Sequence, residues 1–112
     1  MKSIKKNEYE ILNRLIEVIK DRKLYRKENS YVSKLFESGQ DLILRKISEE
    51  SLEIVLASKS FSSKEIAHEV SDLLFHILIL IEYHGINFNM VLKELTRREG
   101  VSGIDEKKDR SK

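Results

Sequence analysis

Residues 40–84, QDLILRKISEESLEIVLASKSFSSKEIAHEVSDLLFHILILIEYH, contain two long apolar runs at helical spacing, separated by a serine-rich stretch at 60–63. The apolar positions recur every three or four residues, which predicts two helices over about residues 40–58 and 62–84. The stretch between them is too short for anything but a tight turn. We therefore expect an antiparallel helical hairpin at the centre of the fold.

The ends of the hairpin helices carry recognisable boundary signals. Ser62 followed by Glu65 forms the capping-box pattern that begins a helix. Gly85 fits the left-handed position that closes one. Outside the hairpin, the same periodicity predicts three more helices, over about 5–22, over 31–37 with Ser30 as N-cap and Gly39 as its end, and from a cap at Asn87 or Asn89 to Arg98.

The whole chain reads as one all-α domain. Its 112 residues include no proline and four glycines, and strand-like alternation is absent. We expect about five helices in an antiparallel bundle over residues 1–99, and a charged, loosely ordered tail over 100–112. The last long helix is apolar over much of its circumference, so a partner chain is expected to complete the bundle as a homodimer.

Composition excludes several classes of function. The net charge is +2, from 21 basic and 19 acidic residues, which argues against a general nucleic-acid binder. The chain has no cysteine, so disulfides, thiol catalysis and zinc–thiolate sites are excluded. The apolar run Ile77–Ile81 is far too short to span a membrane, and the polar N-terminus does not resemble a signal peptide. We expect a cytoplasmic protein.

Acidic residues gather on both helices of the predicted hairpin, as Glu49, Glu50 and Glu53 on the first and Glu69 and Asp72 on the second. Residues three or four apart share a helical face. Counted from the turn, Glu53 matches Glu69 and Glu50 matches Asp72, one helical turn further out. If the two acidic faces point at each other, their carboxylates form a compact cage of oxygens.

A cage of like charges is unfavourable unless a cation fills it. Magnesium prefers carboxylate and water oxygens and shares its coordination shell with phosphate. A bound ion would polarise a phosphoanhydride and lower the pKa of an attacking water. The alternative is that these faces are simply solvated, as acidic helix faces often are, and that the chain is a non-catalytic helical adaptor.

Two neighbouring residues have two interpretations each. Lys46 lies three residues before Glu49, where it would either contact a phosphate or form an ordinary ion pair within the helix. His76 lies on the arc between Glu69 and Asp72, where it would either take part in the site or be a satisfied polar residue. Di-iron bundles use Glu-x-x-His pairs, whereas Glu-x-x-Asp favours hard, redox-inert metals.

The spacing EExxE…ExxD, over 49–53 and 69–72, resembles the signature of MazG-like all-α nucleotide pyrophosphatases. Further segments narrow the resemblance to the phosphoribosyl-ATP pyrophosphohydrolases of histidine biosynthesis. They are Ser30-Tyr31 with Lys34-Leu35 and Gly39, the segment KISEE at 46–50, EVSDLLFH at 69–76, Arg22, and Leu95 to Arg98. The chain departs from the family pattern at Val32, Ser48, Ser51, Ser71 and Phe75, none of which removes a carboxylate.

The resemblance implies magnesium-dependent hydrolysis of phosphoribosyl-ATP to phosphoribosyl-AMP and pyrophosphate by a dimer with its site near the interface. It implies metal binding by four residues, Glu50, Glu53, Glu69 and Asp72. Glu49 becomes the candidate to orient or deprotonate the attacking water. The candidate substrate-binding residues are Arg22, Ser30, Tyr31, Lys34, Lys46 and His76. A pyrophosphatase for other nucleoside triphosphates, within the same superfamily, remains an alternative.

Overall fold

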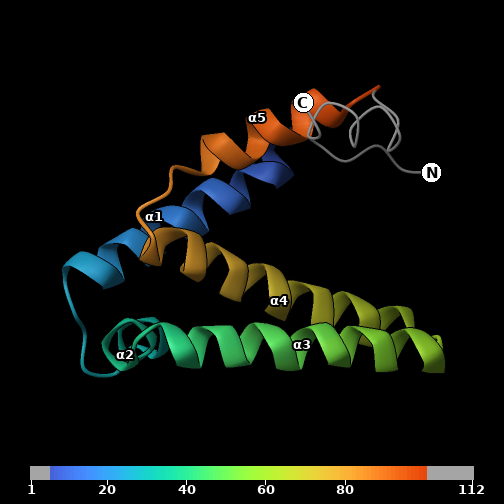
Figure 1. Ribbon diagram of the computed structural model, residues 1–112, viewed down its shortest axis with the longest axis horizontal. Helices are drawn as coiled ribbons and strands as arrows, with labels where there is room; N and C mark the ends of the chain where they lie inside the picture. Colours follow the sequence, from blue (N-terminus) through green and yellow to red (C-terminus); the bar gives the residue numbers. More distant parts are fainter. Residues whose placement is uncertain (1–5, 101–112) are drawn as a thin grey trace, which may run out of the picture.

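The computed structural model describes residues 6–100, and within them it confirms the all-α class (Figure 1). Regular structure is entirely helical in this range. The elements are the 3-10 helix η1 (Lys6–Tyr9) and the α-helices α1 (Glu10–Leu24), α2 (Tyr31–Ser38), α3 (Gln40–Ser60), α4 (Ser63–Tyr83) and α5 (Phe88–Arg98). The predicted tail falls almost entirely on 101–112, outside the described residues.

The two longest helices, α3 and α4, lie side by side and antiparallel as the predicted hairpin (Figure 1). α3 runs two residues further than predicted, because Phe61 takes the left-handed conformation that ends it, with φ 57°. The Ser62 side chain then accepts a hydrogen bond from the backbone N–H of Glu65, at 3.3 Å. This is the N-cap half of the predicted capping box, and it fixes where α4 begins.

We expect Ser62→Ala to lower the free energy of unfolding by about 1 kcal/mol, because the substitution leaves an N-terminal N–H of α4 without its side-chain acceptor. Urea denaturation of the metal-free protein measures this loss. Ser63→Ala is the matched control, since it removes a neighbouring exposed hydroxyl that does not occupy the cap. Equal losses in the two variants would show that the cap contributes nothing.

The remaining helix ends follow the sequence signals with small shifts. α1 begins at Glu10, later than predicted, because the preceding residues form the 3-10 turn, and residue 5 lies outside the described range. Ser30 caps α2 by accepting from the N–H of Ser33, at 3.2 Å. Gly39, with φ 93°, separates α2 from α3. Asn87, rather than Asn89, caps α5.

The core lies at the root of the hairpin, where α1 and α2 pack against the adjoining ends of α3 and α4 (Figure 1). Its centre consists of Ile43 and Ile79, which are completely buried, with Ile19 and Leu35 almost so. The other members of this cluster are Val32, Phe36 and Leu78. The root therefore has a conventional apolar core, and it holds α2 against α4.

The other half of the hairpin, toward the turn, is not covered. Leu52 and Leu56 on α3 are each 59% exposed, and Phe61 at the turn is 89% exposed. On α4, Val70 and Leu74 are also exposed, and α5 buries none of its residues. None of the helices within residues 6–100 is both long and apolar enough to cross a membrane.

Candidate functional site

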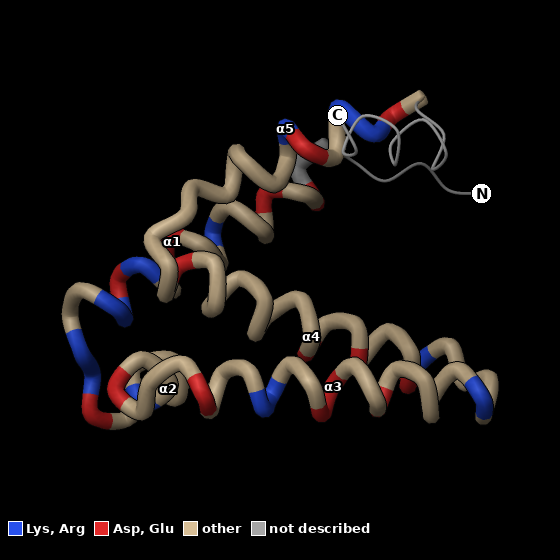
Figure 2. Tube along the Cα trace, in the orientation of Figure 1, with Lys and Arg blue, Asp and Glu red and all other residues tan. Residues whose placement is uncertain are grey.

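Acidic positions of α3 and α4 lie in the same part of the hairpin, midway between its root and the turn (Figure 2). Nearest the turn, the carboxyl groups of Glu53 and Glu69 interact directly, as their matched distance from the turn predicts. The pKa of Glu69 is raised, first by its side-chain hydrogen bond with Glu53, then by burial, and then by the negative charge of Glu53. Oε2 of Glu69 is buried and has no hydrogen-bond donor within the described part of the chain.

These two carboxylates line an open cavity of about 300 Å³ near the turn. Its other walls are Leu56, Ala57, Ser60 and Glu65. The cavity combines a carboxylate pair with an apolar floor and opens to solvent. Such an arrangement leaves room for a hydrated cation beside the carboxyl groups.

One helical turn nearer the root, Glu50 and His76 form a buried pair. Glu50 is 8% exposed and His76 is 6% exposed. Nδ1 of His76 lies 2.7 Å from Oε1 of Glu50 and 3.0 Å from the carbonyl oxygen of Asp72. Nε2 of the same ring lies 2.8 Å from the Tyr31 hydroxyl, at the start of α2. A continuous hydrogen-bonded chain thus links α2, α4 and α3.

The partners of His76 assign its protons. Nδ1 faces two acceptors, a carboxylate and a carbonyl, so it carries the proton and donates. In the neutral ring Nε2 then accepts from the Tyr31 hydroxyl. Burial, and then the negative charges of Glu50, Asp72 and Glu49, raise the pKa of Tyr31, so its hydroxyl keeps the proton it donates.

The structure bears on the predicted two-level cage at both of its levels. Glu53 and Glu69 are paired at the first level. At the second level the Glu50 carboxylate is bonded to His76, whose Nδ1 also lies against the backbone carbonyl of Asp72. The Asp72 carboxylate instead lies 3.4 Å from Nε2 of His68, one turn away on the same helix.

One residue near the site was missed by sequence analysis. His68, Glu69 and Asp72 can bring one ligand atom each within 4.8 Å of the others, a geometry that could hold a metal ion. Acidic groups this exposed often hold none, and His68 is largely open to solvent. The signal for His68 was present in the sequence, as an i, i+4 spacing to Asp72.

Glu49 and Lys46, three residues apart on α3, form an ion pair. The Lys46 ammonium is 3.9 Å from the Glu49 carboxylate, and both side chains are partly exposed. This is the intrahelical ion pair that was one of the two interpretations of Lys46. An exposed pair of this kind is weak, so either partner can turn to a ligand at little cost.

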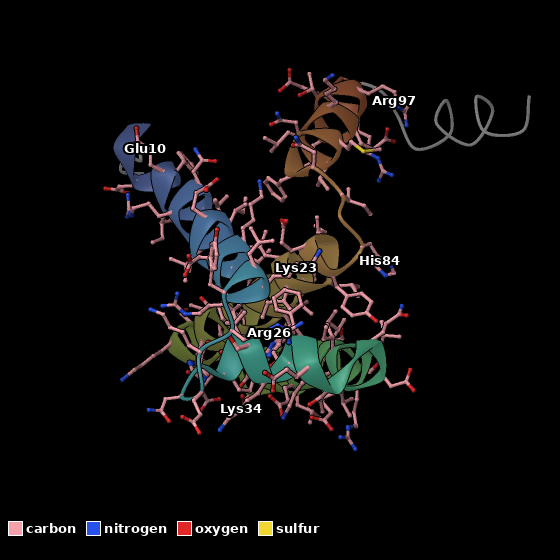
Figure 3. All side chains as sticks on the ribbon, turned by 90° about the vertical axis from the view of Figure 1, so that its left-hand side faces the viewer. Glu10, Lys23, Arg26, Lys34, His84 and Arg97 are labelled. Carbon is pink, nitrogen blue, oxygen red and sulfur yellow. The ribbon has the colours of Figure 1, made fainter. Side chains whose placement is uncertain are left out.

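The predicted substrate-binding residues outside the hairpin lie near the end of α1, in the α1–α2 connection and on α2. Figure 3 labels one of them, Lys34 on α2. Ser30 uses its hydroxyl as the cap of α2, and Lys34 is exposed on that helix. Arg22 forms an ion pair with Asp21. The buried Ser33 was not anticipated: its hydroxyl donates to the Arg22 carbonyl oxygen at 3.0 Å and accepts from the backbone N–H of Lys27 at 3.1 Å.

The sequence is similar to one family over most of its length. The family model for phosphoribosyl-ATP pyrophosphohydrolase matches residues 12–99. The phosphoribosyl-ATP pyrophosphatase of Nitrosospira multiformis is 52% identical over 98 residues, covering 88% of this chain and 81% of the relative. Those of Nitrosomonas eutropha and Vesicomyosocius okutanii are 46% and 43% identical, covering 90% and 91% of this chain and 86% and 97% of the relatives.

Proposed function

This chain belongs to the phosphoribosyl-ATP pyrophosphohydrolase family, and from that premise we propose that it hydrolyses phosphoribosyl-ATP to phosphoribosyl-AMP and pyrophosphate with the help of magnesium. The observation that carries the proposal is the family match over residues 12–99, which spans every carboxylate of the hairpin site. This reaction is a step of histidine biosynthesis. Because the substrate is a multiply charged nucleotide that membranes retain, we place the reaction in the cytoplasm.

The residues present fit a hard divalent cation. The site offers carboxylate oxygens and no thiolate, which is the donor set that suits magnesium. The buried Oε2 of Glu69, which lacks a donor, and the repulsion between Glu69 and Glu53 are both relieved by a positive ion between them. Glu53, Glu69 and Asp72, together with the free oxygen of Glu50, would hold the ion. When bound, magnesium supplies charge neutralisation and polarisation of the phosphates.

The chain's own residues then bind and orient the substrate. Hydrolysis to a monophosphate and pyrophosphate breaks the anhydride between the α and β phosphates, with water adding to phosphorus and pyrophosphate leaving. We assign Glu49 to orient this water and accept its proton, since its carboxylate is accessible and held only by a weak ion pair. Lys46, Arg22 and Lys34 are the cations assigned to phosphate and ribose, and Ser30 and Tyr31 shape the mouth of the site.

We also propose that the working form is a homodimer. The exposed apolar side chains of the hairpin, above all Leu52, Leu56 and Phe61, form a surface too apolar for a helix pair that stands alone in water. A second copy of the same hairpin would cover them by packing helix against helix. Because Glu53 and Glu69 lie on the same half of the hairpin, the partner would also enclose the site.

The test of the activity is pyrophosphate release from phosphoribosyl-ATP. We expect turnover with millimolar magnesium and its loss in excess chelator, because the carboxylates alone cannot neutralise the phosphates. The common nucleoside triphosphates, tested side by side, should be turned over poorly. Full activity in chelator would contradict the metal requirement. Preference for an ordinary triphosphate would instead contradict the substrate.

A further inference from the structure

Both ring nitrogens of His76 already have partners within the protein, so neither is free for a ligand. The ring is 6% exposed, Nδ1 faces Glu50 and the Asp72 carbonyl, and Nε2 faces Tyr31. An imidazole has only these two polar atoms. A substrate phosphate or a metal ion would have to displace an existing bond to reach either. The family resemblance suggested a substrate-binding role, but the ring is packed as a part of the protein interior.

His76 contacts Glu50, which is one of the residues assigned to bind the metal ion. Its Nδ1–H holds Oε1 of Glu50, which leaves Oε2 as the oxygen available to a cation. The imidazole is itself held in place, by the hydroxyl of Tyr31 and by edge-to-face packing against the rings of Tyr31 and Phe75. A carboxylate with one oxygen fixed in this way has lost its rotational freedom before any ion arrives.

We propose that His76 is a positioning residue, which orients the Glu50 carboxylate for magnesium and couples it through Tyr31 to the start of α2. The proposal rests on the proposed function, since it takes Glu50 as a metal ligand. Partners that orient metal ligands in this way are worth about 10- to 100-fold in metal affinity or activity. The role differs from substrate binding in what it controls: the affinity for the ion rather than the affinity for the nucleotide.

The test compares two substitutions at one position. His76→Asn keeps an N–H donor near the place of Nδ1, whereas His76→Leu keeps only volume. Magnesium binding to each protein is measured by titration calorimetry without substrate. We expect His76→Leu to weaken binding of magnesium by about 10- to 100-fold and His76→Asn to recover most of that loss. In turnover at saturating magnesium, the KM for phosphoribosyl-ATP should change much less in both variants.

Two further variants complete the design. Tyr31→Phe removes the hydrogen bond between the Tyr31 hydroxyl and His76. Because Tyr31 is exposed, this variant can be measured even if His76→Leu does not fold. It should weaken magnesium binding by less than about tenfold, which is the worth of one neutral hydrogen bond. The matched control is His84→Leu, which removes the exposed imidazole at the far end of α4 (Figure 3) and should leave magnesium binding unchanged.

The possible outcomes are distinct. Equal magnesium affinity in the parent, His76→Leu and Tyr31→Phe would overturn the positioning role while leaving the activity in place. A rise in the KM for phosphoribosyl-ATP in the His76 variants, with magnesium binding unaltered, would show that His76 acts in substrate binding instead. Equal losses in the Asn and Leu variants would show that the N–H donor is not what matters. A parent protein that binds no magnesium would overturn both this inference and the proposed metal site.

Discussion

Glu53→Gln should be at least as stable as the parent without metal, and should respond far less to magnesium. The raised pKa of Glu69 means that the folded chain disfavours its ionised form beside Glu53. At neutral pH this repulsion lowers the free energy of unfolding. The amide keeps the shape of the side chain and removes the charge. In chelator, the melting temperature of the variant should therefore equal or exceed that of the parent.

With magnesium the order should reverse. An ion that binds only the folded state stabilises it by mass action, by about 2.7 kcal/mol at a hundredfold excess over Kd. The parent gains this and the variant gains much less, because it has lost a charged ligand. Turnover of the variant should fall by about a hundredfold or more, since bound metal contributes several kcal/mol to the transition state and each 1.4 kcal/mol is roughly tenfold.

The measurement is thermal melting of both proteins in chelator and in millimolar magnesium, together with pyrophosphate release. Glu17→Gln, the same change on the exposed face of α1, is the control and should behave as the parent does. If magnesium raises the melting temperatures of the parent and of Glu53→Gln by the same amount, Glu53 is not a ligand. A helical adaptor with solvated acidic faces would show neither the gain nor the reversal.

The double variant Leu52→Glu, Leu56→Glu should be a monomer, whereas the parent should be a dimer. Both leucines are 59% exposed, on the half of α3 toward the turn. Two carboxylates there would face their own copies or apolar groups of the partner chain, and burying an unpaired charge is costly. Because the leucines contribute little to the core of their own chain, the monomer should remain helical.

Light scattering and sedimentation at micromolar concentration measure the mass directly, and far-UV circular dichroism checks the helices. Asn29→Glu, an added charge in the exposed α1–α2 connection, is the control and should leave the dimer intact. A parent protein with the mass of one chain would contradict the homodimer. An unchanged mass in the double variant would instead place the interface elsewhere, and α5, which buries no residue, would be the next surface to alter.

How far the sequence predicts this structure depends on how local each signal is. Ser30, Ser62 and Gly39 act within one turn of their own helix, and the structure places each where it was expected. Helix ends differ from their predicted positions where a neighbouring residue ends the helix, as Phe61 does for α3. Periodicity gave the hairpin, because α3 and α4 follow each other with a turn too short for any other arrangement.

The site was predicted less completely, because its contacts join distant parts of the chain. Matched distances from the turn were enough to pair Glu53 with Glu69. They could not show that His76 would bond Glu50, since the bonds of this ring span 26 residues to Glu50 and 45 to Tyr31. The bond to Tyr31 depends on how α2 packs on α4, which is decided by buried residues such as Leu35 and Ile79 rather than by any local pattern.

The uneven core of the hairpin also determines where the backbone opens. We expect amide protons at the root, around Ile43 and Ile79, to exchange with solvent most slowly, because these residues are completely buried. Amide protons near Phe61 have few buried neighbours, so we expect local fraying of the two helices to be enough for their exchange. Glu53 and Glu69 lie on this more weakly protected half. An ion bound between them would slow exchange in both helices at once. It would therefore stabilise the end of the hairpin that lacks a core of its own.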